Sequence, residues 1–182
     1  MSNLHKVLKN RLTHKQIVLP KPADKEVEIY DDSLLITETD VDGIITYANR
    51  RFCKVSGYTK EELIGMPHAI TRHPDMPKGL FVAMWKIISA KKIWRGYIKS
   101  LSKSGKYYWT LMYVQAKLDE NREIVGYTAT RRKAYVSSLM EVEKKYKELQ
   151  GEEHVNDEYF MRAELFHGDA LATQYSMDPL KK

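Results

Sequence analysis

The stretch IWRGYIKSLSKSGKYYWTLMYVQAKLDENREIVGYTATR, residues 93–131, contains three segments with the composition of β-strands. Residues 93–101, 106–118 and 123–131 are rich in Ile, Val, Thr, Tyr and Trp, which favour the pleated, partly buried surface of a sheet. SKSG separates the first two segments and DENR the last two, and both have the composition of turns. Connections this short join antiparallel strands. The sequence therefore predicts three consecutive antiparallel strands here.

Two further strands are predicted before this stretch. LLITET (34–39) and IITYA (44–48) flank DVDG, a turn that ends in Gly43, so a hairpin is expected. Short helices should follow, because Thr59 and Glu62 have the spacing of a capping box. A longer helix is predicted from about residue 76 to 90, where four apolar residues repeat at helical intervals: Phe81, Met84, Trp85 and Ile88. This order predicts an α+β domain over residues 31–134, a five-stranded antiparallel sheet with short helices on one face.

The flanking segments are predicted to be helical. In residues 1–30, Leu4, Val7, Leu8 and Leu12 share one helical face, and the prolines of LPKPADKE then end the helix. In residues 135–182, a two-heptad seam has spacings of four, three, four and three: Tyr135, Leu139, Val142, Tyr146 and Leu149. The seam could join two copies of the chain, or the helix could pack on its own domain. EYFMRAELF (158–166) suggests another short helix within an acidic tail.

Composition narrows the class of protein. The chain has 182 residues, a net charge of +6 and one cysteine, Cys53, so no intramolecular disulfide framework is possible. It has no apolar run of membrane-spanning length and no secretory signal, which predicts a cytoplasmic protein. Zinc spacings and other nucleic-acid-binding patterns are absent, so no nucleic-acid partner is expected. None of the common catalytic or nucleotide-binding motifs is present, so the sequence does not predict an enzyme.

The loop RHPDMP, residues 72–77, holds a cation, an imidazole and a carboxylate between two prolines. Asp75 could cap the following helix, with Pro77 in its first turn, and losing such a cap costs about 1 kcal/mol. That interpretation leaves His68, Arg72 and His73 unexplained. Guanidinium and imidazole groups beside a helix start would suit an anionic cofactor that contains a ring. Trp85 and Trp94 could line the same cavity, or they could simply be core residues.

A family resemblance favours the cofactor. The segment ITYANRRFCKVSGYTKEELIGMPHAITRHPDMPKGLFVAMW, followed by WRGYIKSLSKSGKYYW and IVGYTATRRK, resembles the PAS domain of the Aer-type aerotaxis receptors over residues 33–133. Members of that family bind FAD non-covalently and report the redox state of the cell. Ser100 stands where the family usually has asparagine, which removes an amide from a predicted polar contact. The resemblance implies a flavin site formed by Asn49, His68, Arg72, His73, Asp75, Trp85, Trp94 and Ser100.

The resemblance also implies a function. The aerotaxis receptors continue into a membrane anchor and a signalling region, whereas this chain stops after one short helix and an acidic tail. We therefore expect a stand-alone cytoplasmic redox sensor of a bipartite energy-taxis system. It would form a homodimer and signal to a separate membrane-bound chemotaxis transducer, which would hold it at the inner membrane. The alternative is a PAS adaptor for protein–protein contacts that holds no cofactor, or that binds haem through His68 or His73.

Overall fold

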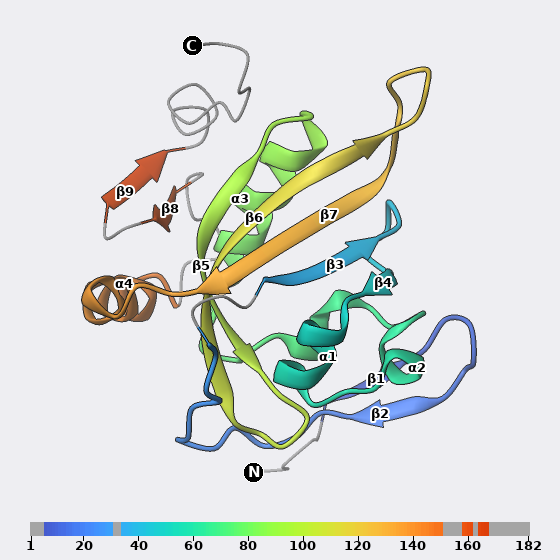
Figure 1. Cartoon of the computed structure of the whole chain (residues 1–182). Helices are drawn as coiled ribbons and strands as arrows, with labels where there is room; N and C mark the ends of the chain where they lie inside the picture. Colours follow the sequence, from blue (N-terminus) through green and yellow to red (C-terminus); the bar gives the residue numbers. More distant parts are fainter. Residues whose placement is uncertain (1–5, 31–33, 151–157, 162–163, 168–182) are drawn as a thin grey trace.

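A five-stranded antiparallel sheet forms the centre of the structure (Figure 1). The computed structural model describes residues 6–30 and 34–150, together with the backbone of 158–161 and 164–167. The strand order is β4-β3-β7-β6-β5. The bounds are β3 Leu35–Thr39, β4 Ile45–Ala48, β5 Trp94–Leu101, β6 Tyr107–Leu118 and β7 Ile124–Lys133. The predicted five-stranded α+β architecture is confirmed.

Strand β7 lies between β3 and β6 and pairs antiparallel with both. Ala129 is opposite Thr37 on β3 and Val114 on β6. The approach of β3 to β7 requires Gly126, because a Cβ at this position would collide with the backbone oxygen of Thr39. This register places one set of β7 side chains on the concave face of the sheet.

Short helices cover the concave face. They are α1 Arg50–Ser56, α2 Lys60–Leu63, the 3-10 helix η1 His68–Thr71 and α3 Lys78–Ser89. The capping box predicted for α2 is present: the Thr59 hydroxyl accepts from the Glu62 amide at 3.2 Å, and the Glu62 carboxylate accepts from the Thr59 amide at 3.0 Å. Asn49 caps α1 by accepting a hydrogen bond from the Phe52 amide at 2.8 Å.

Helix α3 begins later than the sequence suggested. Its N-cap is Pro77, in an extended conformation, and the N-cap makes no side-chain capping bond. The predicted cap by Asp75 is therefore wrong, because Asp75 lies in a turn closed by the bond from the Met76 amide to the His73 carbonyl, and the helix begins only at Lys78. The predicted apolar stripe is only partly buried: Met84 and Ile88 are in the core, whereas Trp85 is 37% exposed.

Helix α4, Val136–Glu148, packs on the opposite face of the sheet. Val142, Tyr146 and Leu149 are buried in the core, and the Tyr146 hydroxyl donates to the Tyr97 carbonyl at 2.8 Å. Of the two uses considered for the seam, packing on its own domain is therefore confirmed. Of the other two seam residues, Leu139 is partly buried and Tyr135 is 43% exposed.

The predicted N-terminal amphipathic helix is wrong. Strands β1 Val7–Lys9 and β2 Gln16–Val18 form an antiparallel hairpin there instead. The physical cause is Asn10, whose side-chain oxygen accepts from the amides of Leu12 and Thr13 at 2.8 and 2.9 Å. Such local bonding favours a turn over a helix, and an isolated helix of this length would be only marginally stable.

The expected helix around residues 158–166 is also wrong. Strands β8 Glu158–Met161 and β9 Glu164–His167 pair as an antiparallel hairpin, which suits the high β-propensity of Tyr and Phe. The rest of the predicted acidic tail lies outside the described residues. Within the residues that the structure describes, no helix is both long and apolar enough to span a membrane.

Asn10 also fastens the hairpin to the domain. It is 3% exposed, and its amide donates to the Ile64 carbonyl at 2.7 Å, next to a bond from the Arg11 amide to the Gly65 carbonyl. We predict that Asn10→Ala lowers the free energy of unfolding by about 1–3 kcal/mol, because three backbone groups lose their partner. Urea unfolding would measure this, and limited proteolysis should cut residues 6–20 faster. The exposed neighbour variant Thr13→Ala is the control, and equal stability of the two variants would contradict the prediction.

Candidate functional site

A cavity of about 240 Å³ lies between the concave face of the sheet and the helices η1 and α3. Most of its wall is apolar. Helix α3 contributes one side of the cavity, and β5, β6 and β7 contribute the other. The apolar lining residues include Phe81, Met84, Trp85, Ile88, Ile98, Met112, Val114, Tyr127 and Ala129. A concave, mostly apolar cavity with a few polar groups is the usual form of a small-molecule site.

The alternation of side chains along the strands determines what reaches this cavity. On β7, Tyr127, Ala129 and Arg131 all line it, whereas the intervening residues face the other side. Thr37 and Thr39 on β3 lie opposite Ala129 and Tyr127 and line it as well. The spacing of two therefore brings a cation, Arg131, to a wall that is otherwise largely apolar.

Arg131 is bound to two neighbours at the wall of the cavity. Its Nη1 donates to the Thr37 hydroxyl at 3.0 Å, and its Nη2 lies 2.9 Å from Nε2 of His68. A guanidinium has no acceptor atom, so Nε2 of His68 must be the unprotonated, accepting nitrogen. His68 Nε2 is also 3.0 Å from the Thr37 hydroxyl. The three residues come from β7, η1 and β3, so they join the helical layer to the sheet.

The charges of these groups follow from their burial. Loss of hydration, reinforced by the nearby Arg131, lowers the pKa of His68 to about 3, so the imidazole is neutral at physiological pH. Burial also lowers the pKa of Arg131 to about 10, which still leaves it charged at pH 7. Arg131 is 3% exposed. The cavity therefore has one buried positive charge and a neutral imidazole beside it.

Buried hydroxyl groups add hydrogen-bonding capacity close to the cavity. Thr71 and Ser100 line it and are each 4% exposed. On the concave face of β6, the hydroxyl of Thr110 is buried without a hydrogen-bond partner among the described residues, and the buried hydroxyl of Tyr108 lies beside those of Ser100 and Thr71. Burial raises the pKa of Tyr108 to about 12, so it stays a neutral donor. These groups are able to bind a polar ligand edge.

Aromatic contacts form the outer part of the cavity. The Arg72 guanidinium lies 3.9 Å from the ring centroid of Phe81. Trp85 packs edge-on against Tyr127 with ring centroids 5.1 Å apart. A Cβ on Gly43 would lie 3.2 Å from the Trp85 ring, so the small residue gives the indole room. Trp85 is the most exposed member of this group, which places it where the cavity meets solvent.

Four of the eight site residues suggested by the sequence line the cavity. They are His68, Arg72, Trp85 and Ser100. The bridge between the backbones of Arg72 and Ser100 ties the RHPDMP loop to the edge strand β5 and brings these two residues together. The structure thus assembles half of the predicted set around one space.

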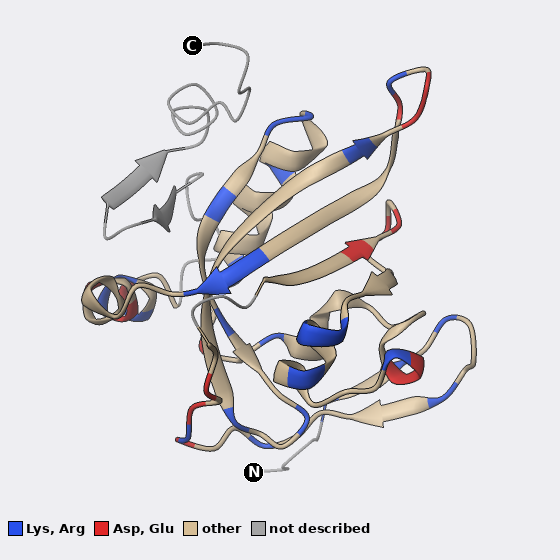
Figure 2. Ribbon diagram, in the orientation of Figure 1, with Lys and Arg blue, Asp and Glu red and all other residues tan. Residues whose placement is uncertain are grey.

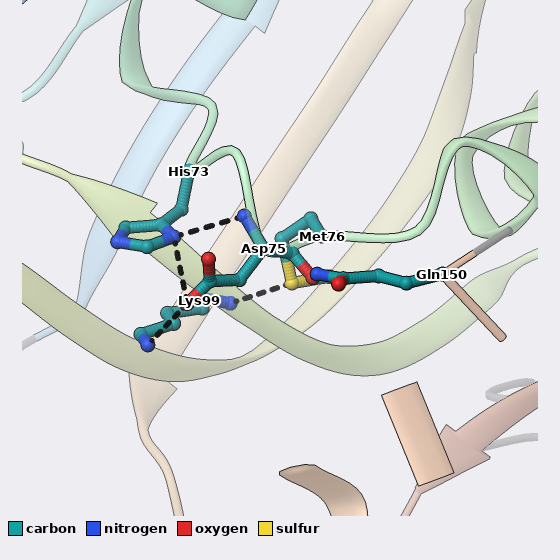
Figure 3. Close-up of polar contacts among 5 residues, drawn as sticks. All are labelled: His73, Asp75, Met76, Lys99 and Gln150. Atoms are coloured by element: carbon teal, nitrogen blue, oxygen red, sulfur yellow. Dashed lines mark hydrogen bonds and ion pairs between the residues drawn. The ribbon is translucent and has the colours of Figure 1, made fainter. Parts of the chain in front are cut away.

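The other four predicted residues do not line the cavity. Asn49 is the N-cap of α1, and Trp94 is fully buried with its indole over Gly96. His73 and Asp75 lie next to each other and beside Lys99, outside the cavity (Figure 3). The Asp75 carboxylate accepts from Lys99 Nζ at 2.9 Å, and its backbone oxygen accepts from Gln150 just beyond α4 at 2.7 Å. Their positions suggest structural roles instead.

The sequence analysis missed five polar or charged residues that line the cavity: Thr37, Thr39, Asp42, Thr71 and Arg131. Arg131 belongs to the run RRK, which suggests an exposed strand end, and the end of β7 is indeed basic in Figure 2. Only the alternation Tyr127, Ala129, Arg131 distinguishes it from its neighbour. Had the strand register been known, a charge on the apolar face would have marked the site.

Comparisons with known proteins agree with this architecture. Residues 45–131 match the family model described as the PAS fold. The chain is 38% identical to the aerotaxis receptor of Escherichia coli K12 over 130 residues, which cover 71% of this chain and 26% of that receptor. The chain thus matches about a quarter of the length of this relative.

Solved structures share the fold. A PAS domain of a protein from Colwellia psychrerythraea is 26% identical, with a TM-score of 0.52, over 56% of this chain and 86% of that one. A light-oxygen-voltage domain studied with a flavin analogue has a TM-score of 0.54 at 18% identity, over 63% of this chain and 86% of that one.

The sheet order, the helical layer and the family match define a PAS domain, a signalling module rather than an enzyme. Within that class, the PAS domain of this chain is similar to that of the aerotaxis receptor.

The lowered pKa of His68 predicts how stability depends on pH. Below pH 6.5 the unfolded chain binds a proton at His68, whereas the folded chain binds it only near pH 3. The free energy of unfolding therefore decreases as the pH falls from 6.5 towards 3. The contribution of one such proton is at most about 1.4 kcal/mol per pH unit. His68→Gln should remove this part of the slope between pH 7 and 5, as measured by urea unfolding. Exposed His14→Asn is the control, and an unchanged slope in His68→Gln would refute the prediction.

Proposed function

We propose that this chain is a redox sensor for energy taxis that binds FAD non-covalently in the cavity and reports its state to a chemotaxis transducer. The single observation that carries the proposal is the apolar cavity with a few buried polar groups at its wall, among them Arg131, Ser100 and Thr71. The similarity to the aerotaxis receptor supports a role in energy taxis. The sequence resemblance that implies FAD covers residues 33–133, which include the residues that line the cavity.

The residues present fit a flavin ring. A flat ring would be held between the α3 side chains Met84 and Ile88 and the strand residues Val114 and Ala129, all of which line the cavity. The polar edge of the ring needs donors, and Arg131, Ser100 and Thr71 supply them. Ser100 offers one hydroxyl where the aerotaxis family has an amide. The volume of about 240 Å³ is below the roughly 300–1,000 Å³ of typical ligand pockets, so the phosphate and adenine end of FAD would extend outside.

A bound flavin supplies reversible acceptance of electrons, and the protein residues respond to the change in charge. Ser100 is the link to the rest of the domain, because its strand neighbour Lys99 holds the RHPDMP loop. The Lys99 amide donates to the Met76 sulfur at 3.3 Å, and its ammonium donates to Asp75. Asp75 in turn contacts Gln150, which follows α4 (Figure 3). We propose that α4 and the residues after it are the output segment.

An absorption spectrum of the purified protein before and after dithionite tests the proposal. Flavin bands that bleach on reduction are expected, and acid extraction then distinguishes FAD from FMN. A colourless protein that does not bind added FAD would favour the adaptor without a cofactor. A Soret band would indicate haem, although His68 could serve as a ligand through Nε2 only if its bond to Arg131 broke.

A variant that fills the cavity gives a sharper test. Ala129 is 8% exposed and lines the cavity, so Ala129→Leu should lower flavin affinity at least tenfold by occupying the space of the ring. Its neighbour Thr130 points to the other face of β7, and Thr130→Leu should leave affinity unchanged. Fluorescence titration with riboflavin measures both. Equal affinities in folded samples of the two variants would place the flavin elsewhere.

A further inference from the structure

Among the residues that the structure describes, the buried Arg131 has no negatively charged partner. Its guanidinium carries five N–H donors, and two of its nitrogens each contact one neighbour, a hydroxyl and an imidazole. No ion pair or further hydrogen bond involves Arg131 within residues 6–30 and 34–150. The ring of Phe52, 5.2 Å from the guanidinium carbon, offers only a weak electrostatic contact. The charge therefore lacks a counterion within the described part of the protein.

The acid on the adjacent strand is unable to reach Arg131. Glu38 follows Thr37 on β3, so its side chain points to the opposite face of the sheet, where it pairs with Lys117. His68, which does reach Arg131, is neutral and accepts one bond. Both neighbours thus orient the guanidinium without neutralising it.

A buried cation in this state is costly for the fold. An ion removed from water is stabilised only by a counterion or a full set of hydrogen bonds, and an apolar residue of similar size is often better tolerated at such a position. Arg131 lines a cavity that a ligand is able to enter, so the missing partner can be part of that ligand.

We infer that Arg131 determines the specificity of the cavity by selecting a ligand form that carries negative charge on the edge facing it. Thr37 and His68 are positioning residues that hold the guanidinium in place. The inference deepens the proposed function, on which it relies for the identity of the probe. For a flavin, it means that the cavity favours the reduced ring in its deprotonated form over the neutral oxidised ring.

Neighbouring arginines provide a matched pair of variants. Arg132 follows Arg131 on β7 but points to the other face, where its Nη2 donates to the Tyr113 hydroxyl at 2.8 Å. Arg131→Met and Arg131→Gln remove the buried charge, and Arg132→Met removes the neighbouring exposed one. Riboflavin is the probe, because it has the ring without the phosphates that could bind other cations.

Two measurements on the full chain test the inference. In protein stripped of any bound flavin, Arg131→Met should raise the Tm by several degrees, whereas Arg132→Met should not. With riboflavin, Arg131→Met should weaken binding of the reduced form at least tenfold more than binding of the oxidised form. A tenfold difference lowers the midpoint potential by about 30 mV for a two-electron couple. Arg132→Met should leave the potential unchanged.

The outcomes separate the inference from the proposed function. If wild-type protein binds neither riboflavin nor added FAD, the proposed function fails, while the Tm comparison still tests the unpaired charge. If riboflavin binds but the potential of Arg131→Met and Arg131→Gln equals that of the wild type, the inference is overturned and the proposed function stands. A lower Tm or loss of folding in both Arg131 variants would also overturn it, because the charge would then be compensated within the protein.

Discussion

The pairing of β7 with strands on both sides is the constraint on which the site depends. Because β7 is fixed between β3 and β6, its side chains cannot change face without breaking two ladders. Tyr127, Ala129 and Arg131 consequently face the cavity, and Arg132 faces away. A shift by one residue would turn Tyr127, Ala129 and Arg131 to the other face of the sheet. The chemistry of the site is thus a consequence of sheet register.

Much of the fold could be predicted from local sequence. The strands have strong β-propensity, and the capping box at Thr59 and Glu62 is a short-range signal that tertiary contacts do not override. The N-terminal segment was different, because its apolar spacing favoured a helix while a single residue, Asn10, favoured a turn. The bond from Asn10 to the Ile64 carbonyl spans 54 residues, and no local pattern reveals it.

The candidate site was only half predictable for a related reason. His68, Arg72, Trp85 and Ser100 occur in motifs that imply a ligand, and all four line the cavity. His73 and Asp75 occur in the same motif but do not line the cavity: the Asp75 carboxylate accepts from Lys99 (Figure 3), and the His73 ring packs edge-on against Tyr107. Composition does not determine on which side of a loop a side chain lies. Arg131 was missed because a charge in a basic run gives no sign of burial.

The RHPDMP loop connects the two faces of the sheet at its edge. Arg72 contacts the cavity side, Lys99 lies on the strand between, and Gln150 follows the helix on the far side. A protein that senses a ligand in a buried cavity needs contacts of this kind between the cavity and a surface element that a partner protein can bind. The two prolines limit the conformations of the loop and keep these contacts in one arrangement.

The most direct test of this account is a crystal structure of the full chain as purified, grown in the presence of flavin. The account predicts density for the ring between α3 and β7, with an oxygen or nitrogen of the ring within hydrogen-bond distance of the Arg131 guanidinium. A ring bound outside the cavity, or a carboxylate of the protein paired with Arg131, would contradict it.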